Sequence, residues 1–390
     1  MIERELSKKL LKSIEKYQVI SLSGPRQSGK TTLLKSIFPN FKYISLELPN
    51  ERTFVQEDPL KFLNQFKNGL ILDEAQKVPE IFSYIQTIVD NNRNYGPYIL
   101  SGSENFLLSE RISQSLAGRV RIFKLLPFSL LELQNTEYFI DNTDKFLFKG
   151  MYPRIYDRKL NPNSWLQDYI ETYVERDVRN IKNISNISLF QKFIKLAAGR
   201  TGQILNFNEL ANNCGVTHNT AKSWLRILEA SYIIFTLNPY YKNFNKRIMK
   251  QPKLYFYDTG LACSLLGINS TEQLNTYYLR GGLFESFIIS EYVKYRFNLG
   301  LKNNSYYWRD RYGHEIDLLI ENGNNLYPIE IKSGQSINND YFKNIKWWSE
   351  ISGVSPEFAS IIYAGDDQQE RKYGKIYSWK NIEKLFGSFI

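Results

Sequence analysis

Short, mostly apolar runs recur through the first 130 residues, and each ends in a polar or glycine-containing turn. Such runs are typical of strands buried on both faces of a parallel sheet. A stretch with apolar residues at helical spacing follows the first run. The pattern predicts strands at residues 18–22, 43–46, 69–72, 98–100 and 120–123 and a helix at 31–37, which together indicate an α/β domain.

The middle of the chain has helical periodicity. Residues 164–182 carry apolar side chains at helical spacing, which predicts a connecting helix capped by Asn163 or Ser164. Residues 189–237 then show a helix-turn-helix rhythm with a tight turn at Gly215. Its predicted parts are a helix at 189–198, a second helix opened by residues 206–211, a third helix at 218–230 capped by Thr217, and a strand at 232–237 that starts a wing.

The last third returns to strand periodicity after one helix at 282–296. Strands are predicted at 306–309, 314–320 and 326–332, joined by hairpin turns. A helix with Trp347 and Trp348, a strand at 359–363 and a closing helix complete this core. The expected domains are therefore 1–150, 151–187, 188–260 and 261–390.

Composition narrows the class of protein. Hydrophobic residues make up 43% and charged residues 23% of the 390, which is typical of a soluble globular protein. No apolar run reaches the ~20 residues of a membrane helix, and the charged start lacks the apolar part of a signal peptide, so we expect a cytoplasmic protein. The net charge of +10 permits nucleic-acid binding without establishing it. The cysteines, Cys214 and Cys263, have no zinc-ligand spacing and are expected to be buried thiols.

The first apolar run leads into a complete phosphate-binding loop, G-P-R-Q-S-G-K-T. A strand before it and a helix after it provide the context in which backbone N–H groups surround a phosphate. Lys30 is expected to reach the β- and γ-phosphates of ATP, and Thr31 to bind Mg²⁺. The candidate nucleotide-binding residues are Gly24, Pro25, Arg26, Gln27, Ser28, Gly29, Lys30, Thr31 and Thr32.

Two carboxylates stand at the carboxyl end of another apolar run. Ligands of open α/β sheets bind at the carboxyl ends of strands. We therefore expect Asp73 to hold Mg²⁺ through water and Glu74 to act as the general base on the attacking water. The alternative is that the two acids merely open the following helix.

Two further residues complete the predicted ATP site. In ATPases with a strand inserted beside the phosphate-loop strand, the turn after that strand carries a polar residue that senses the γ-phosphate. Ser103 is the first candidate for this role, and Ser101 and Asn105 are alternatives. Arg119 is a candidate trigger arginine, with a surface salt bridge as the alternative.

A second group of carboxylates is predicted in the C-terminal region. Side chains alternate between the faces of a strand, so Glu315 and Asp317 share one face, as do Glu330 and Lys332. Asp317, Glu330 and Glu285 are expected to hold Mg²⁺ or Mn²⁺, and Lys332 to position or deprotonate a water. This pattern resembles the PD-(D/E)xK motif of restriction-endonuclease-like proteins. The alternative is a module that binds nucleic acid or a partner protein without cleavage.

Basic residues cluster around the predicted winged helix. The segment from Ala230 to Tyr257 has no acidic residue and interleaves lysines, Lys242 and Lys253 among them, with aromatic side chains. A domain-joining role and a solvated basic face remain alternatives. The candidate nucleic-acid contacts are His218, Asn219, Lys222, Arg226, Lys246, Arg247 and Lys250.

Several motifs together resemble one protein family. The runs D-E-A-Q-K-V-P at 73–79, L-S-G-S at 100–103, L-A-G-R at 116–119 and L-P-F-S at 126–129 are similar to those of prokaryotic AAA+-type ATPases with a C-terminal domain of unknown function. The similarity continues through D-Y-I at 168–170 and R-D-V-R at 176–179 into most of the second half. The resemblance implies an AAA+-type ATPase fused to a winged helix and a nuclease-like module.

Three functions fit these features. The first is an ATP-hydrolysing protein that couples nucleotide state to DNA engagement. The second is a nucleotide-dependent switch or scaffold for a protein partner, with an inactive nuclease-like module. The third is a nuclease effector controlled by the ATPase. A homo-oligomer in which a neighbour donates an arginine is compatible with all three.

Overall fold

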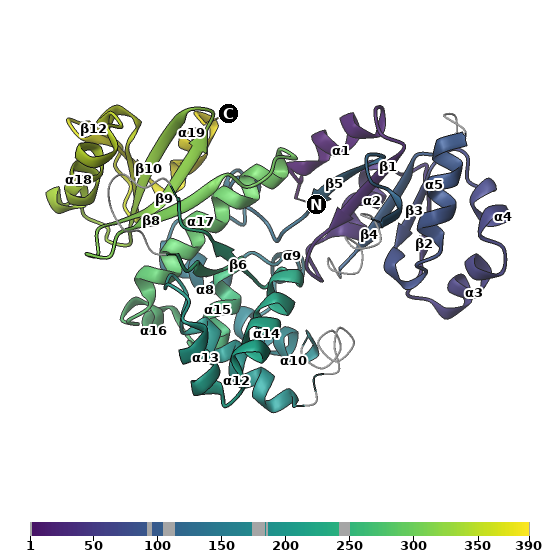
Figure 1. Ribbon diagram of the computed structural model, residues 1–390, viewed down its shortest axis with the longest axis horizontal. Helices are drawn as coiled ribbons and strands as arrows, with labels where there is room; N and C mark the ends of the chain where they lie inside the picture. Colours follow the sequence, from purple (N-terminus) through teal and green to yellow (C-terminus); the bar gives the residue numbers. More distant parts are fainter. Residues whose placement is uncertain are drawn as a thin grey trace.

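The computed structural model of the chain describes residues 2–91, 96–103, 114–173, 184, 186–241 and 250–389. In Figure 1 the N-terminal sheet lies at the right, the helices from the middle of the chain lie below, and a second sheet lies at the upper left. The long helix α17 (Arg280–Asn298) runs between these regions.

The N-terminal sheet of the described residues is parallel, with the strand order β2-β3-β4-β1-β5. This confirms the predicted α/β fold with a parallel sheet. It also confirms that a strand, β4, is inserted between the phosphate-loop strand β1 and the carboxylate strand β3. The strands are β1 (Val19–Ser23), β2 (Lys42–Ser45), β3 (Leu70–Asp73), β4 (Tyr98–Gly102) and β5 (Val120–Lys124).

Helices cover both faces of this sheet. Leu70 and Leu72 of β3 pack on one face and Ile71 on the other, because successive strand side chains alternate. The helices α3 (Pro49–Glu57), α4 (Pro59–Asn64) and α5 (Ile81–Asn91) cover the first face, and α1 (Leu6–Ile14) and α2 (Lys30–Ile37) cover the second. The short helix η1 (Ala75–Lys77) follows β3.

The middle region is mostly helical. The predicted third helix of the helix-turn-helix pattern matches α14, and Thr217 caps it by accepting a hydrogen bond from the Thr220 N–H (3.2 Å). Gly215 ends the preceding helix in the left-handed conformation. The elements are α7 (Leu130–Gln134), α8 (Thr143–Lys149), α9 (Pro153–Asp157), α10 (Pro162–Tyr173), α12 (Ile187–Ala198), α13 (Phe207–Cys214), α14 (His218–Ala230), antiparallel β6 (Ile234–Leu237) and β7 (Lys253–Phe256), α15 (Thr259–Leu265) and α16 (Thr271–Asn275).

The predicted cap of α10 is wrong. Asn161, not Asn163 or Ser164, accepts the capping hydrogen bond, from the Ser164 N–H (3.2 Å). Pro162 takes the first helical position, where a missing N–H costs nothing, so the helix starts earlier than its apolar pattern indicates. The predicted end of this helix, at 174–182, lies outside the described residues.

The second sheet has the strand order β12-β13-β11-β10-β9-β8. The three predicted hairpin strands are present, and β11 and β13 extend the sheet in parallel from β10. Strands β12 and β13 were not predicted, because β12 is short and polar. The elements are β8 (Ser305–Arg309), β9 (Glu315–Asn322), β10 (Asn325–Lys332), η3 (Asn339–Phe342), α18 (Lys343–Ser352), η4 (Pro356–Phe358), β11 (Ser360–Tyr363), β12 (Gln369–Arg371), β13 (Gly374–Ser378), η5 (Trp379–Asn381) and α19 (Ile382–Gly387).

One hydrophobic core joins side chains from Leu126 to Phe389. At its centre the Trp379 ring lies 6.0 Å from Phe139, 5.7 Å from Phe146 and 6.1 Å from Phe287 between ring centroids. This cluster thus includes residues from each of the four expected domains, whereas the buried apolar side chains of the N-terminal strands lie in two other clusters.

Cys214 and Cys263 are buried free thiols, as expected. No helix among the described residues combines the length and apolar character needed to cross a bilayer. Asn105, Lys242, Lys246 and Arg247 lie outside the described residues.

Candidate functional site

The phosphate loop connects the carboxyl end of β1 to the first turn of α2. Gly24 is required by close approach, because a Cβ there would lie 2.0 Å from the Leu125 carbonyl oxygen. Gly29 caps α2 in the left-handed conformation, with φ of 90°, which favours glycine. The loop therefore turns tightly and points the N-terminus of α2 at the space above the sheet, where an anion binds favourably.

Lys30 is 7% exposed and folds back over its own loop. Its ammonium donates hydrogen bonds to the carbonyl oxygens of Gly24 (2.8 Å) and Pro25 (2.9 Å). The positive charge is thus held against the backbone of the phosphate loop. The other loop side chains differ in exposure: Ser28 is buried, Arg26 half-buried, and Gln27 and Thr32 exposed.

Asp73 collects three hydroxyl donors at the carboxyl end of β3. Its carboxylate accepts hydrogen bonds from Thr31 (2.8 Å), Tyr43 (2.7 Å) and Ser101 (2.6 Å). The strand register pairs Asp73 with Ser101, so the sheet itself brings these groups together. Burial alone would raise the pKa of Asp73, but these hydrogen bonds and the Lys30 charge outweigh it and lower the pKa.

A magnesium ion fits this part of the site. The Thr31 hydroxyl and the Asp73 carboxylate lie together, and Mg²⁺ prefers oxygen ligands of this kind beside substrate phosphates. Its chemistry there would be to neutralise charge on the β- and γ-phosphates.

Glu74 has a separate set of partners. Its backbone is left-handed, with φ of 55°, which is uncommon for a residue other than glycine and is typical of functional sites. Its carboxylate accepts hydrogen bonds from Ser103 (3.0 Å) and from the Gln76 amide (2.5 Å). Gly102 leaves room for that amide, because a Cβ there would lie 2.4 Å from Gln76 Oε1. Glu74 thus lies next to Asp73 in the chain, but different side chains hold its carboxylate.

Arg119 lies far from the phosphate loop of its own chain. The register places Val120 beside Val19, so Arg119 lies at the amino ends of the strands, whereas the phosphate loop follows their carboxyl ends. Five strand residues separate the two, roughly 16 Å at ~3.3 Å per residue. The Arg119 guanidinium instead pairs with Asp90 of α5 on the surface (2.9 Å).

Arg4 is a residue that the sequence did not reveal. Its guanidinium is buried and donates to the carbonyl oxygens of Ser28 and Leu126, both at 2.7 Å, and pairs with Glu132 at 2.9 Å. It therefore links the phosphate loop to the start of the large core. Arg4 stands in a charged N-terminal stretch that has no motif, so only the fold identifies its role.

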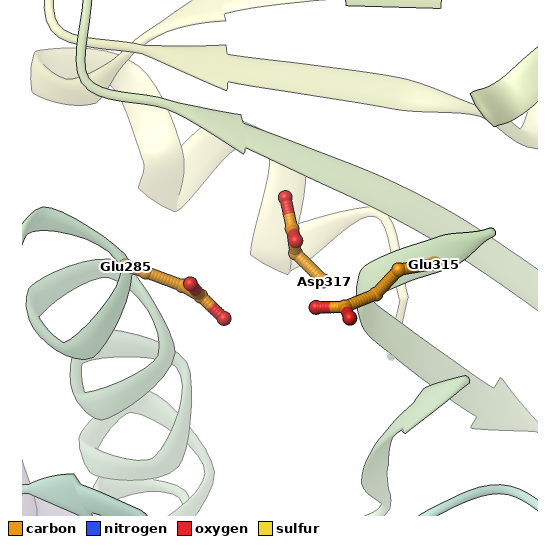
Figure 2. A group of neighbouring side chains, drawn as sticks. All are labelled: Glu285, Glu315 and Asp317. Carbon is orange, nitrogen blue, oxygen red and sulfur yellow. The ribbon is translucent and has the colours of Figure 1, made fainter. Parts of the chain in front are cut away.

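The C-terminal carboxylates gather where α17 faces β9. Figure 2 shows Glu285, Glu315 and Asp317 pointing toward a common space, and one carboxylate oxygen of each lies within 4.8 Å of the others. Glu315 occupies the place in this group that the sequence assigned to Glu330. The alternation along β9 already indicated that Glu315 and Asp317 share a face.

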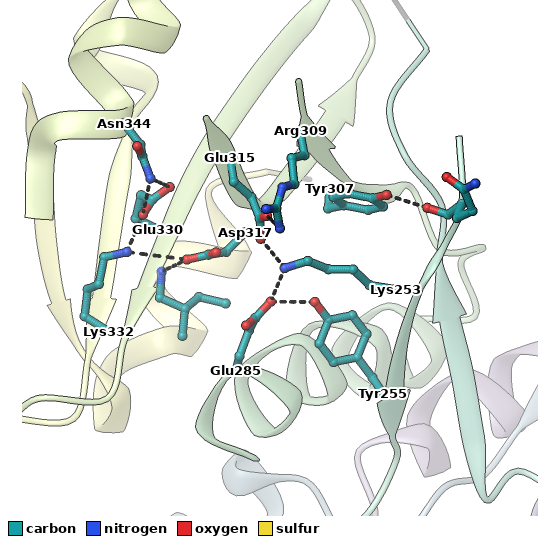
Figure 3. Close-up of polar contacts among 12 residues, drawn as sticks. Lys253, Tyr255, Glu285, Tyr307, Arg309, Glu315, Asp317, Glu330, Lys332 and Asn344 are labelled. Carbon is teal, nitrogen blue, oxygen red and sulfur yellow. Dashed lines mark hydrogen bonds and ion pairs between the residues drawn. The ribbon is translucent and has the colours of Figure 1, made fainter. Parts of the chain in front are cut away.

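Lys253 of β7 enters the same space. Its ammonium pairs with Glu285 (2.9 Å) and with Glu315, as Figure 3 shows. The sequence placed Lys253 on a basic face near nucleic acid, but its side chain is only 3% exposed. Burial alone would lower the pKa of Lys253, yet the field of the surrounding carboxylates, Glu285 first, raises it well above the ordinary value.

Glu330 and Lys332 form a neighbouring pair on β10. The Lys332 ammonium contacts the Glu330 carboxylate and lies 3.8 Å from Asp317. Asn344 of α18 also faces Glu330. Burial, and then the nearby Asp317 charge, raise the pKa of the Glu330 carboxyl. Asp317 therefore lies between the two groups, with Glu285 in the first group and Glu330 in the second.

The predicted nucleic-acid residues lie mainly on one face of α14. Lys222 and Arg226 are exposed at i, i+4 spacing, after the exposed His218 and Asn219. The His218 ring also contacts the Asn208 side chain (2.8 Å). Lys250 is exposed, and Lys246 and Arg247 lie outside the described residues.

Comparison with known proteins divides the chain into three parts. Residues 16–134 match the AAA domain family, residues 140–272 a domain of unknown function (DUF8612), and residues 280–382 another domain of unknown function (DUF4143). The first match covers the phosphate loop and the carboxylate strand, so this part of the chain is similar to AAA domains in both sequence and sheet geometry.

Similar proteins cover most of the chain. An uncharacterized protein of Mycobacterium tuberculosis is 28% identical over 332 residues, 84% of this chain and 73% of that protein. An uncharacterized protein of Methanocaldococcus jannaschii is 24% identical over 351 residues, 82% of this chain and 75% of that protein. The solved Walker-type ATPase of Pyrococcus abyssi has 15% identity and a TM-score of 0.46 over 68% of this chain and 96% of its own.

Proposed function

We propose that the protein binds ATP with Mg²⁺ and hydrolyses it to ADP and phosphate. The observation that carries this proposal is the contact of Thr31 with Asp73, which joins the phosphate loop to the carboxylate strand at one edge of the sheet. Beside this pair, Glu74 is positioned to accept a proton from the attacking water, and Lys30 to neutralise charge on the γ-phosphate. Ser103 orients the Glu74 carboxylate.

Hydrolysis by lysine variants tests the proposal. Lys30→Met is expected to lose MgATP binding and turnover, because it removes the ammonium that bonds the Gly24 and Pro25 carbonyls of the phosphate loop. The control is Lys16→Met, an exposed lysine just after α1, which should hydrolyse ATP like the wild type. Equal turnover in Lys30→Met and wild type would show that the hydrolysis comes from another site or another protein.

We further propose that nucleotide state is coupled to DNA engagement by the second half, which would combine a winged helix and a nuclease-like fold. The exposed basic stripe of α14 and the shared core that begins just after β5 support this coupling. The nuclease-like fold could either cleave nucleic acid or bind DNA or a partner without cleavage. The ammonium of Lys253 lies among the carboxylates where a metal would bind, which favours binding without metal-dependent cleavage.

Charge reversal on α14 tests the DNA proposal. Lys222→Glu with Arg226→Glu should weaken DNA binding and lower the salt slope by roughly one unit per lost phosphate contact. Lys302→Glu with Lys343→Glu, equal in charge and exposed elsewhere, should have a smaller effect. Absence of DNA binding at low salt, or equal losses in both variants, would favour the protein-partner scaffold.

The nuclease-effector alternative predicts Mn²⁺-dependent cleavage of nucleic acid. That cleavage should disappear in Asp317→Ala and Lys332→Ala, which remove the two groups that face each other between the cluster and its neighbouring pair. Equal cleavage by wild type and both variants would indicate a contaminating nuclease.

A further inference from the structure

The strongest unassigned feature is a lysine inside a carboxylate cluster that resembles a metal site. Glu285, Glu315 and Asp317 present oxygens close enough to share one divalent ion. The three come from α17 and β9, whereas Lys253 comes from β7 in the middle region. Figure 3 shows its ammonium between the carboxylates of Glu285 and Glu315.

The position of Lys253 is fixed by backbone and side-chain contacts. β7 pairs with β6 along its length, and Ile204 and Thr201 bridge to it from the other side. Two serines of α17 hold the end of the strand: Ser286 bonds both the N–H (3.1 Å) and the carbonyl (3.0 Å) of Phe256. Ser290 donates to the Tyr257 carbonyl (2.8 Å). The lysine is therefore built into the fold.

The surroundings of the ammonium leave little room for a second cation. The Tyr255 hydroxyl donates to the same oxygen of Glu285 that pairs with Lys253 (2.5 Å). The Arg309 guanidinium takes the other oxygen of Glu315 (3.0 Å). The Ile331 N–H donates to Asp317 (2.8 Å). A divalent ion needs about six oxygen ligands, and four of the six carboxylate oxygens here already have a cation or a hydrogen-bond donor as partner.

The charges also nearly balance without a metal. The cluster and its neighbouring pair contain four carboxylates, Glu285, Glu315, Asp317 and Glu330, and three cations, Lys253, Arg309 and Lys332. The formal sum is −4 + 3 = −1 before any proton is added. A divalent ion would reverse the sign of a largely buried group and lie against an ammonium of like charge.

We infer that Lys253 is the resident cation of this cluster and takes the place of a divalent metal between Glu285 and Glu315. The residues present thus do not fit the metal that the PD-(D/E)xK pattern implies. The ion pairs of this cluster connect the middle region to the C-terminal sheet. This inference does not depend on ATP hydrolysis.

Manganese binding to the nucleotide-free, full-length protein tests the inference. By titration calorimetry, wild type and the exposed-lysine control Lys250→Met should show no Mn²⁺ site that is sensitive to Glu285→Gln or Glu315→Gln. Lys253→Met exposes three carboxylates and should bind Mn²⁺ at least about tenfold more tightly than wild type. Adding Glu285→Gln to Lys253→Met should abolish the gain.

Thermal unfolding provides a second measurement of Mn²⁺ binding if Lys253→Met is too unstable for calorimetry. Mn²⁺ should raise the melting temperature of Lys253→Met and leave that of wild type unchanged, because only the variant lacks the cation between Glu285 and Glu315. A Mn²⁺ site in wild type that Glu285→Gln or Glu315→Gln removes would overturn the inference. Folded Lys253→Met with no gain in Mn²⁺ binding would overturn it as well.

Discussion

Adjacent carboxylates at the end of β3 have different environments. Asp73 is buried among three hydroxyl donors and has a lowered pKa, which keeps it charged for a magnesium ion. Glu74 turns away through its left-handed backbone and meets Ser103 and Gln76. Ser101 and Ser103, two residues apart on one strand and the turn after it, thus serve different carboxylates.

Alanine variants of the two serines should separate these roles. Ser101→Ala removes a donor to Asp73 and should raise the Mg²⁺ concentration for half-maximal activity, roughly tenfold. Ser103→Ala leaves Asp73 intact but loosens Glu74, so kcat should fall about tenfold at an unchanged Mg²⁺ requirement. Steady-state ATP hydrolysis across a Mg²⁺ series measures both, and identical changes in the two variants would contradict the assignment.

At the scale of elements, Arg4 joins α1, the phosphate loop and α7. Glu132, its partner, also closes a capping box with Ser129 at the start of α7. The Glu132 side chain has no solvent exposure, so the Arg4 charge is its main compensation. Loss of one partner of such a buried pair is costly, since the other charge remains buried.

Arg4→Met should therefore lower the free energy of unfolding by about 3–5 kcal/mol in urea denaturation. Adding Glu132→Gln should restore part of the loss by removing the orphaned charge. Arg158→Met, at an exposed ion pair with Asp157, should change stability by less than about 1 kcal/mol. A loss below about 1 kcal/mol in Arg4→Met would contradict the structural role.

Elements with local signals could be predicted from the sequence, and those defined by distant contacts could not. The phosphate loop and the strands ending at Asp73 and Gly102 are encoded within a few residues of each position. By contrast, Lys253 stands in a run without acidic residues, and its partners Glu285 and Glu315 come from α17 and β9. Only the fold shows that this lysine is buried, and that Arg119 lies at the far end of the sheet.

At the scale of the whole molecule, the N-terminal parallel sheet has core clusters of its own, and one large cluster joins side chains from Leu126 to Phe389. Phe146 comes from the segment expected to end the first domain, yet its ring packs against Phe287 and Trp379. Phe62 is equally buried but belongs to the core of the N-terminal sheet. The residues after β5 therefore depend on the C-terminal half for their stability.

Hydrogen exchange of two phenylalanine variants tests this division. Phe146→Ala should destabilise the large cluster by about 3–5 kcal/mol and speed amide exchange in α17 and β13 more than in β3. Phe62→Ala should have the opposite distribution. Equal acceleration in all three elements by both variants would mean that the molecule unfolds as one unit.

The most direct test of the central claim, ATP hydrolysis at the phosphate loop, is phosphate release by Glu74→Gln at saturating MgATP. Glutamine keeps an acceptor for Ser103 but cannot take a proton from water. The variant should bind MgATP like the wild type and release phosphate about 10²–10³ times more slowly. Wild-type turnover in Glu74→Gln, with nucleotide binding intact, would contradict the assignment of Glu74 and of this edge of the sheet as the hydrolytic site.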